Sequence, residues 1–164
     1  MQLPFLRRDS AAALLHPLGA VPKTAVFATG FAETRRVRLF PRGWTEKTEQ
    51  WEPTSVAGPI EMLRSLQSSH AELEHPLIVF IYDLKDRITS EDRDWLWNHF
   101  GVPVFEQLLG SDNRLLATEC EAHDGLHLIM KVPHSILDRA ACGCGSLSPR
   151  LRQPAKVYVM AAGA

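Results

Sequence analysis

The chain has 164 residues, of which 45% are hydrophobic and 23% charged, and 18 basic against 19 acidic residues give a formal net charge of −1. A nearly neutral chain without long runs of one charge has no general attraction for nucleic acid or an anionic membrane surface, so neither is expected as a partner. The apolar run Ala11–Leu15 is too short to span a membrane and is followed by His16 and Pro17, which argues against a signal sequence.

The first part of the chain predicts a leader followed by the start of a domain. Residues 1–22 are expected to form the leader, and residues 23–164 are expected to form a single α/β domain, because this length suits one compact unit. Apolar, β-favouring residues predict a buried strand over Thr24–Thr29, and alternating residues predict a half-exposed strand over Arg36–Phe40. The polar stretch Arg42–Pro53 predicts a loop.

The middle of the chain predicts alternating helices and strands. An apolar face at helical spacing predicts a helix over Gly58–Ser69, and the most apolar run of the chain predicts a strand covered on both faces over Leu77–Tyr82. A Thr-x-x-Asp capping box predicts the start of a helix over Thr89–His99. Strands are expected at Val102–Glu106 and Arg114–Glu119. Strand, helix and strand in close succession indicate a β-α-β unit, so the expected fold is α/β with a mainly parallel sheet and flanking helices.

The stretch from Glu119 to Pro149 holds all three cysteines and three of the seven histidines. Cys120 ends a predicted strand and is followed by His127, whereas Cys142 and Cys144 share one glycine-rich turn. Zn²⁺ takes thiolate and imidazole ligands in a closed tetrahedron when its role is structural. The sequence therefore predicts a structural zinc site that holds the C-terminal segment.

Several alternatives to this ligand set stay open. His123 competes with His127 for the imidazole position, and His134 lies farther into the connecting loop. The cysteines could instead be thiols without a metal, or a redox Cys-x-Cys pair. An odd number of cysteines fits a reducing compartment better than a disulfide framework, so we expect the protein in the cytoplasm.

Acidic side chains near the cysteines offer a second candidate site. Asp112, Glu119 and Glu121 could form an acidic centre. Because they flank the expected metal, they could also be hydrogen-bond partners of its ligands.

A series of short motifs runs through the second half of the chain in a fixed order. They are Phe100-Gly101-Val102-Pro103-Val104, Ala117-Thr118-Glu119-Cys120, Gly125-Leu126-His127, Cys142-Gly143-Cys144-Gly145 and Ser148-Pro149-Arg150-Leu151. Over roughly residues 77–152 this order resembles the middle of phenylacetate–CoA ligase-like, adenylate-forming (AMP-binding) enzymes. The resemblance implies an α/β fold. It also implies a zinc at the Cys-x-Cys-Gly positions, as in related ligases.

The departures from that family are in the parts that bind ATP. The family's Tyr-Gly-x-Thr-Glu turn supports ATP and magnesium, and Leu109-Gly110-Ser111-Asp112-Asn113 stands in its place here. No glycine-rich phosphate loop with a lysine is visible in Met1–Glu74. The family's mobile domain with its lysine would follow the Cys-x-Cys-Gly element. Lys156, within a strand expected at Lys156–Met160, is a poor substitute for that lysine.

These observations predict a non-catalytic, zinc-binding relative of adenylate-forming CoA ligases that acts as a binding or scaffold module. The expected partner is a second copy of the chain or a ligase-related protein, because a part of a larger fold leaves apolar faces to cover. The alternative is an enzyme, or a binder of small carboxylic acids or acyl-adenylates, that retains the ligase acyl pocket near Phe105–Ser111.

Overall fold

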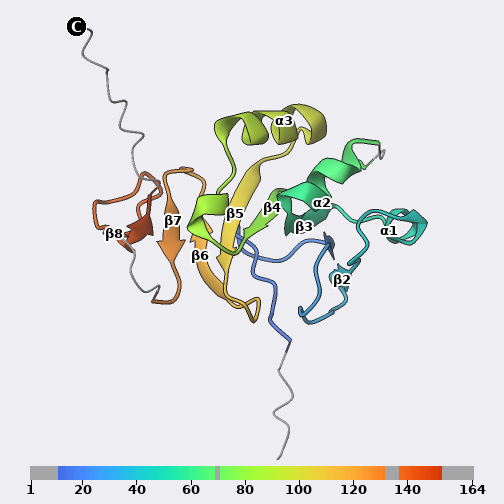
Figure 1. The fold of residues 1–164 in the computed structure, drawn as a ribbon, viewed down its shortest axis with the longest axis horizontal. Helices are drawn as coiled ribbons and strands as arrows, with labels where there is room; N and C mark the ends of the chain where they lie inside the picture. Colours follow the sequence, from blue (N-terminus) through green and yellow to red (C-terminus); the bar gives the residue numbers. More distant parts are fainter. Residues whose placement is uncertain (1–10, 69–70, 132–136, 153–164) are drawn as a thin grey trace, which may run out of the picture.

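The computed structural model describes residues 11–68, 71–131 and 137–152, and within these ranges the strands form one nine-stranded sheet (Figure 1). The strand order is β2-β1-β3-β4-β5-β6-β7-β9-β8. The strands are β1 (Thr24–Val26), β2 (Val37–Leu39), β3 (Ser55–Pro59), β4 (Leu77–Ile81), β5 (Val104–Leu109), β6 (Leu115–Glu119), β7 (Leu126–Leu128), β8 (Leu137–Asp138) and β9 (Arg150–Leu151). The helices are α1 (Glu46–Trp51), α2 (Ile60–Arg64) and α3 (Ser90–Phe100), with short 3-10 turns at η1 (Ser65–Ser68) and η2 (Leu84–Asp86).

The sheet has a parallel half and an antiparallel half that meet at β5. Strands β2, β1, β3, β4 and β5 pair in parallel, whereas β5, β6, β7, β9 and β8 pair antiparallel. The α/β class is confirmed, but the sheet is mixed rather than mainly parallel. The reason is the tight turn at Gly110–Arg114, which can join only antiparallel neighbours, because a parallel pair needs a long crossover.

Strand β4 is buried on both faces, as its apolar sequence predicts. Leu77, Val79 and Ile81 belong to one hydrophobic cluster, and Ile78 and Phe80 belong to a second cluster on the opposite face. This alternation is the period-two pattern of a strand with both faces covered. All five side chains are at most 2% exposed.

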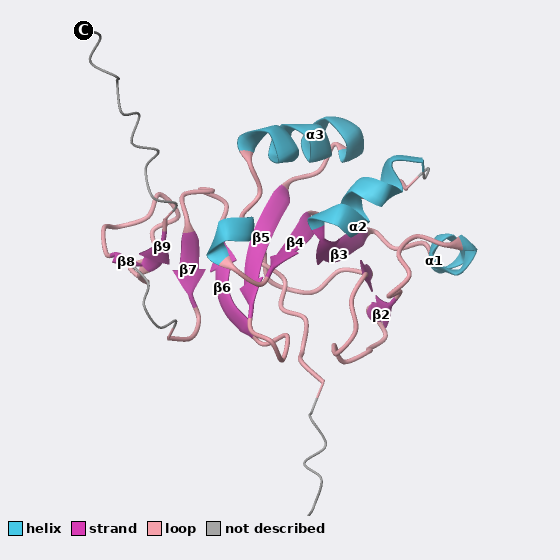
Figure 2. Ribbon diagram, in the orientation of Figure 1, coloured by secondary structure: helices cyan, strands magenta, loops and turns pink. Residues whose placement is uncertain are grey.

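The two faces are covered by different parts of the chain. Leu63 of α2 and Leu96 of α3 pack in the first cluster, and Figure 2 shows both helices on the same side of the sheet. Ala12, Leu14 and Phe31 belong to the second cluster. Residues of the predicted leader are therefore buried against the sheet, beside a bridge between Ala12 and Phe31.

The β4-α3-β5 unit matches its prediction closely. The Thr89 hydroxyl accepts a hydrogen bond from the backbone N–H of Asp92 at 3.1 Å, and the Asp92 carboxylate accepts one from the backbone N–H of Thr89 at 3.1 Å. The helix ends at Gly101, which adopts a left-handed φ of 68° and donates its N–H to the carbonyl of Trp97. Strands β4 and β5 then pair in parallel along their whole length.

Two predicted elements differ from the structure. The stretch Arg42–Pro53 contains helix α1 rather than only loop, because Thr45 and Thr48 form a capping box at its start. The predicted helix Gly58–Ser69 begins two residues later, since Gly58 and Pro59 belong to β3. A Cβ at Gly58 would lie 3.0 Å from Cβ of Phe27, so glycine permits this close approach of chain segments.

The end of the chain was only partly predicted. Strands β7, β8 and β9 follow the predicted strand Arg114–Glu119 and complete the antiparallel half. The strand expected at Lys156–Met160 lies outside the described residues. Among the helices that the structure describes, none has the length and apolar character needed to cross a membrane.

We expect Thr89→Ala to lower the free energy of unfolding by about 1 kcal/mol, because it removes the side-chain cap of α3. Urea denaturation monitored by circular dichroism measures the change. Ser90→Ala is the matched control, since Ser90 is the exposed first residue of the same helix. Equal midpoints for the two variants would contradict this role of the cap.

Candidate functional site

The structure brings Cys120, His127, Cys142 and Cys144 together at the antiparallel end of the sheet. Their ligand atoms all lie within 4.8 Å of one another, so the group could hold a metal ion. Cys120 directly follows β6, and His127 lies in β7, which pairs with β6. Cys142 and Cys144 lie in the turn between β8 and β9.

Two distances between ligand atoms fit a tetrahedral thiolate and imidazole site. The Sγ atoms of Cys120 and Cys142 are 3.6 Å apart, and Sγ of Cys144 lies 3.5 Å from Nε2 of His127. Bonds of ~2.3 Å to sulfur and ~2.0 Å to nitrogen give tetrahedral edges of roughly 3.5–3.8 Å. The donor set therefore fits Zn²⁺ in number and chemistry, and these two distances match the edges of its tetrahedron.

The Cys-x-Cys turn is shaped by its own backbone hydrogen bonds. The N–H of Gly145 donates to the carbonyl of Cys142 at 2.9 Å, and the N–H of Cys142 donates to the carbonyl of Ser146 at 3.2 Å. Gly145 adopts a φ of 84°, which favours glycine. The turn thus directs two neighbouring thiols to the same place.

The thiols of this group differ in acidity. The backbone N–H of Cys144 lowers the pKa of the Cys142 thiol to about 6, and burial raises the pKa of the Cys120 thiol to about 12. Of these two thiols, Cys142 therefore loses its proton more readily than Cys120. A bound Zn²⁺ would remove the proton from Cys120, because coordinating thiols are deprotonated.

The two histidines of the β6–β7 region have different surroundings. Nε2 of His127 faces the sulfur of Cys144, while its Nδ1 is buried without a hydrogen-bond partner among the described residues. Nδ1 of His123 instead lies 3.4 Å from the carboxylate of Glu119 and 3.3 Å from the guanidinium of Arg93. The structure thus places His127, and not His123, with the cysteines. His134 lies outside the described residues.

The structure does not bring the three acidic candidates together. Asp112 lies in the turn before β6 and pairs with Arg114 at 2.8 Å, whereas Glu119 lies at the opposite end of β6. Glu121 is exposed. Asp112 and Glu119 lie far apart because the extended strand β6 separates the two positions.

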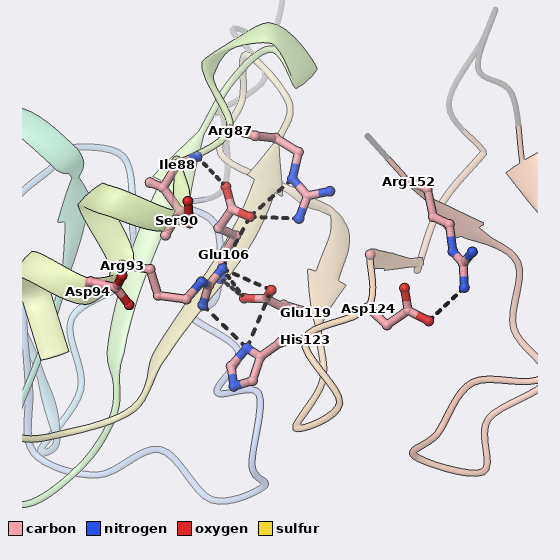
Figure 3. A pocket seen from close by; sticks show the side chains of 11 residues that line it. Arg87, Ile88, Ser90, Arg93, Asp94, Glu106, Glu119, His123, Asp124 and Arg152 are labelled. Atoms are coloured by element: carbon pink, nitrogen blue, oxygen red, sulfur yellow. Dashed lines mark hydrogen bonds and ion pairs between the residues drawn. The ribbon is translucent and has the colours of Figure 1, made fainter. Parts of the chain in front are cut away.

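Next to the cysteines lies a charged pocket with a cavity volume of about 370 Å³ (Figure 3). Its lining includes Arg87, Arg93, Glu106, Glu119, His123 and Asp124. Figure 3 shows that the guanidinium of Arg93 lies between the carboxylates of Glu106 and Glu119 and contacts both. Glu106 is 0% exposed and Glu119 is 1% exposed.

The buried carboxylates of this pocket are paired with arginines. One oxygen of Glu106 accepts hydrogen bonds from Arg87 Nε at 3.1 Å and Nη2 at 2.8 Å, and the other accepts from the N–H of Ile88 at 2.8 Å. Glu119 accepts from Arg93 Nη2 at 3.0 Å and from the N–H of Glu106 at 3.0 Å. Each buried carboxylate thus has an arginine as its counter-charge. The pair between Arg93 and Glu119 also links α3 to β6, the strand that precedes Cys120.

Sequence reasoning missed most of this network, although one signal was available. Glu106 and Gln107 stand inside an otherwise apolar strand, and a charged residue in such a strand needs a buried partner. The partners Arg87 and Arg93 come from a turn and a helix, so no local pattern identifies them. The stretch Phe105–Ser111 was expected to line an acyl pocket. In the structure, Phe105–Leu109 belong to the buried strand β5, and Glu106 lines the charged pocket.

Comparison with known proteins relates the fold to ligases. No protein-family model matches the sequence, and no curated protein matches it. The chain superposes on 2-hydroxyisobutyryl-CoA ligase in an open conformation in complex with 2-HIB-AMP and CoA, with a TM-score of 0.54 and 14% identity over 81% of this chain and 44% of the ligase chain. The same ligase in the postadenylation state in complex with R3-HIB-AMP gives a TM-score of 0.53 and 14% identity over 84% and 44%.

This likeness shows an acyl-CoA ligase-like fold, and the chain spans less than half the length of the ligase chains that it matches. The resemblance to adenylate-forming CoA ligases is therefore confirmed for the fold. Membership of the phenylacetate–CoA ligase-like branch stays a prediction. The chain thus combines an α/β fold like that of an acyl-CoA ligase with a Cys₃His group that could hold a metal.

We expect Glu106→Gln to lower the free energy of unfolding by about 3 kcal/mol or more, because it leaves the guanidinium of Arg87 buried without its counter-charge. Asp112→Asn is the matched control, since Asp112 pairs with Arg114 at the exposed surface, where an ion pair contributes little. Chemical denaturation measures both. Similar effects of the two substitutions would show that the buried network is not needed for stability.

Proposed function

We propose that this chain is a structural zinc-binding relative of adenylate-forming CoA ligases that acts as a non-catalytic binding or scaffold module. The observation that carries the proposal is the Cys₃His group, whose ligand atoms lie within 4.8 Å of one another. The ligands come from the end of β6, from β7 and from the turn before β9. A zinc ion bound by all four would join these segments.

A structural role for the zinc follows from the number of ligands. Four protein ligands fill a tetrahedral site and leave no position for water, so no metal-activated hydroxide is available. The strands that surround the site are short, with three residues in β7 and two each in β8 and β9. Leu126 of β7 and Leu151 of β9 are buried in the hydrophobic core, and metal binding would add to the stability that this packing gives to the short strands.

The non-catalytic part of the proposal is supported by the turn at Leu109–Asn113. The Asn113 amide donates to the carbonyl of Thr29 at 2.8 Å and accepts from the Tyr82 hydroxyl at 2.9 Å. The Asp112 carboxylate accepts from Arg114 at 2.8 Å. These polar groups are engaged within the protein, in place of the Thr-Glu pair that supports ATP and magnesium in the family.

A binding role is supported by exposed apolar side chains that follow the metal ligands by two or three residues in the sequence. Leu147 is 79% exposed, and Ile129 and Met130 are 55% and 42% exposed. Contact with another protein would cover such side chains. The partner that we propose is a second copy of the chain or a ligase-related protein, in the cytoplasm.

We expect one zinc ion per chain in protein purified without added metal, and loss of that zinc in His127→Asn. His123→Asn is the matched control, because His123 contacts Glu119 and Arg93 rather than the thiols. Elemental analysis measures the metal, and thermal unfolding should show a lower melting temperature for His127→Asn. Zinc-free wild-type protein, or loss of zinc only in His123→Asn, would refute the ligand assignment.

We expect no acid-dependent release of pyrophosphate with ATP, magnesium and a panel of aryl, fatty and small hydroxy acids. The physical reason is that adenylation depends on positioning and neutralising the triphosphate, and the residues of the Leu109–Asn113 turn do not supply these groups. An active adenylate-forming ligase serves as the positive control. Turnover above background that disappears in Asp112→Ala would replace the scaffold proposal with the enzyme alternative.

A further inference from the structure

Arg150 is a buried arginine beside the metal group. It lies in β9 directly opposite His127 of β7, and its side chain is 0% exposed. Its Nη1 donates to the carbonyl and the carboxylate of Asp124, at 2.9 and 2.7 Å. Its Nη2 donates to the carboxylate of Asp138 at 2.8 Å and to the carbonyl of Ala140 at 3.2 Å.

These acceptors belong to the two segments that carry the metal ligands. Asp124 lies between Cys120 and His127, and Asp138 and Ala140 lie just before Cys142. The guanidinium is planar, so its two outer nitrogens fix the distance and angle between whatever they bind. The side chain of Arg150 therefore connects the segment that carries Cys120 and His127 to the segment that precedes Cys142 and Cys144.

The buried charge of Arg150 requires partners that compensate for its removal from water. A charge out of water needs opposite charges and hydrogen bonds in good geometry. Asp124 and Asp138 supply the charges, and hydrogen bonds from Arg150 hold the pKa of Asp124 below its usual value. A hydrogen bond from the backbone N–H of Ala140 likewise lowers the pKa of Asp138, so both carboxylates stay ionised at neutral pH.

We propose that Arg150 is the positioning residue of the metal centre: its contacts with Asp124, Asp138 and Ala140 set the separation between the Cys120–His127 pair and the Cys142–Cys144 pair before a metal binds. This inference rests on the proposed zinc site. It predicts that Arg150 raises the affinity for the metal by fixing the positions of the ligands, without binding the metal itself.

Arg152 provides a matched control within the same chain. Its Nη2 contacts Asp124 at 2.7 Å and its Nε contacts Asp138 at 2.8 Å, so it binds the same two carboxylates. Its side chain is 49% exposed, however. Removal of either arginine changes the net charge equally, but among the described contacts only Arg150 donates hydrogen bonds to backbone carbonyls of both segments.

The experiment measures the affinity of the full chain for Zn²⁺ by chelator competition, and for Co²⁺ by its tetrahedral thiolate absorption. We expect Arg150→Met to weaken binding by roughly 10- to 100-fold, as is typical when a partner of metal ligands is removed. Arg152→Met should change it by about fivefold or less, as expected of an exposed ion pair. Arg150→Lys should not restore the affinity, because a single ammonium group cannot bridge both segments.

The outcomes separate this inference from the proposal on which it rests. Wild-type protein that binds neither metal refutes the zinc site itself. Wild-type affinity in Arg150→Met, with only a lower melting temperature, shows a purely structural role and overturns the inference, as does full rescue by lysine. If Arg150→Met does not fold, Asp138→Asn decides: weaker metal binding with unchanged circular dichroism supports positioning, and unchanged binding refutes it.

Discussion

At the antiparallel end of the sheet, Cys120, His127, Cys142 and Cys144 converge on one point, and our proposal makes this the constraint that positions the surrounding segments. The parallel half has apolar clusters on both faces of β4, and these supply ordinary hydrophobic stabilisation. The strands β7, β9 and β8 contain only two or three residues each, so their pairing supplies little. Leu126 of β7 and Leu151 of β9 join these strands to the hydrophobic core. The ion pairs of Arg150 add directional contacts that hold the short segments in register, and under our proposal a bound metal would add to them.

Two charged networks connect the Cys₃His group to the rest of the protein. On one side, Glu119 precedes Cys120 and binds Arg93 of α3, which extends the contact to Glu106 and Arg87. On the other side, Arg150 joins the segments on which the four ligands lie. The group thus lies between a buried ion network anchored on the helical layer and a buried arginine in the last described strand. This arrangement fits a site that holds chain segments in place.

The sequence predicted those features whose signal is local. The apolar run at Leu77–Tyr82 and the capping box at Thr89 each identified an element, because periodicity and caps are properties of neighbouring residues. The spacing of the cysteines similarly pointed to the four residues that the structure brings together. Helix α1 was missed although Thr45 and Thr48 also form a capping box, since the polar residues around it show no apolar face.

Features set by distant partners could not be predicted in this way. The antiparallel half follows from how β5 turns into β6, and the strands after β6 are too short for a periodic pattern. The ion pairs of Glu106 join residues from a turn, a helix and a strand, so only the folded chain shows them. The role of Arg150 is also hidden, because its acceptors are spread over Asp124 to Ala140.

We propose that the Cys₃His group holds a zinc ion in a closed, structural site. X-ray absorption spectroscopy of the purified protein at the zinc edge can identify the atoms bound to that ion. We expect a first shell of three sulfur atoms at about 2.3 Å and one imidazole nitrogen at about 2.0 Å, with no oxygen ligand. A shell that contains water or carboxylate oxygen, or protein that carries no zinc to measure, would contradict it.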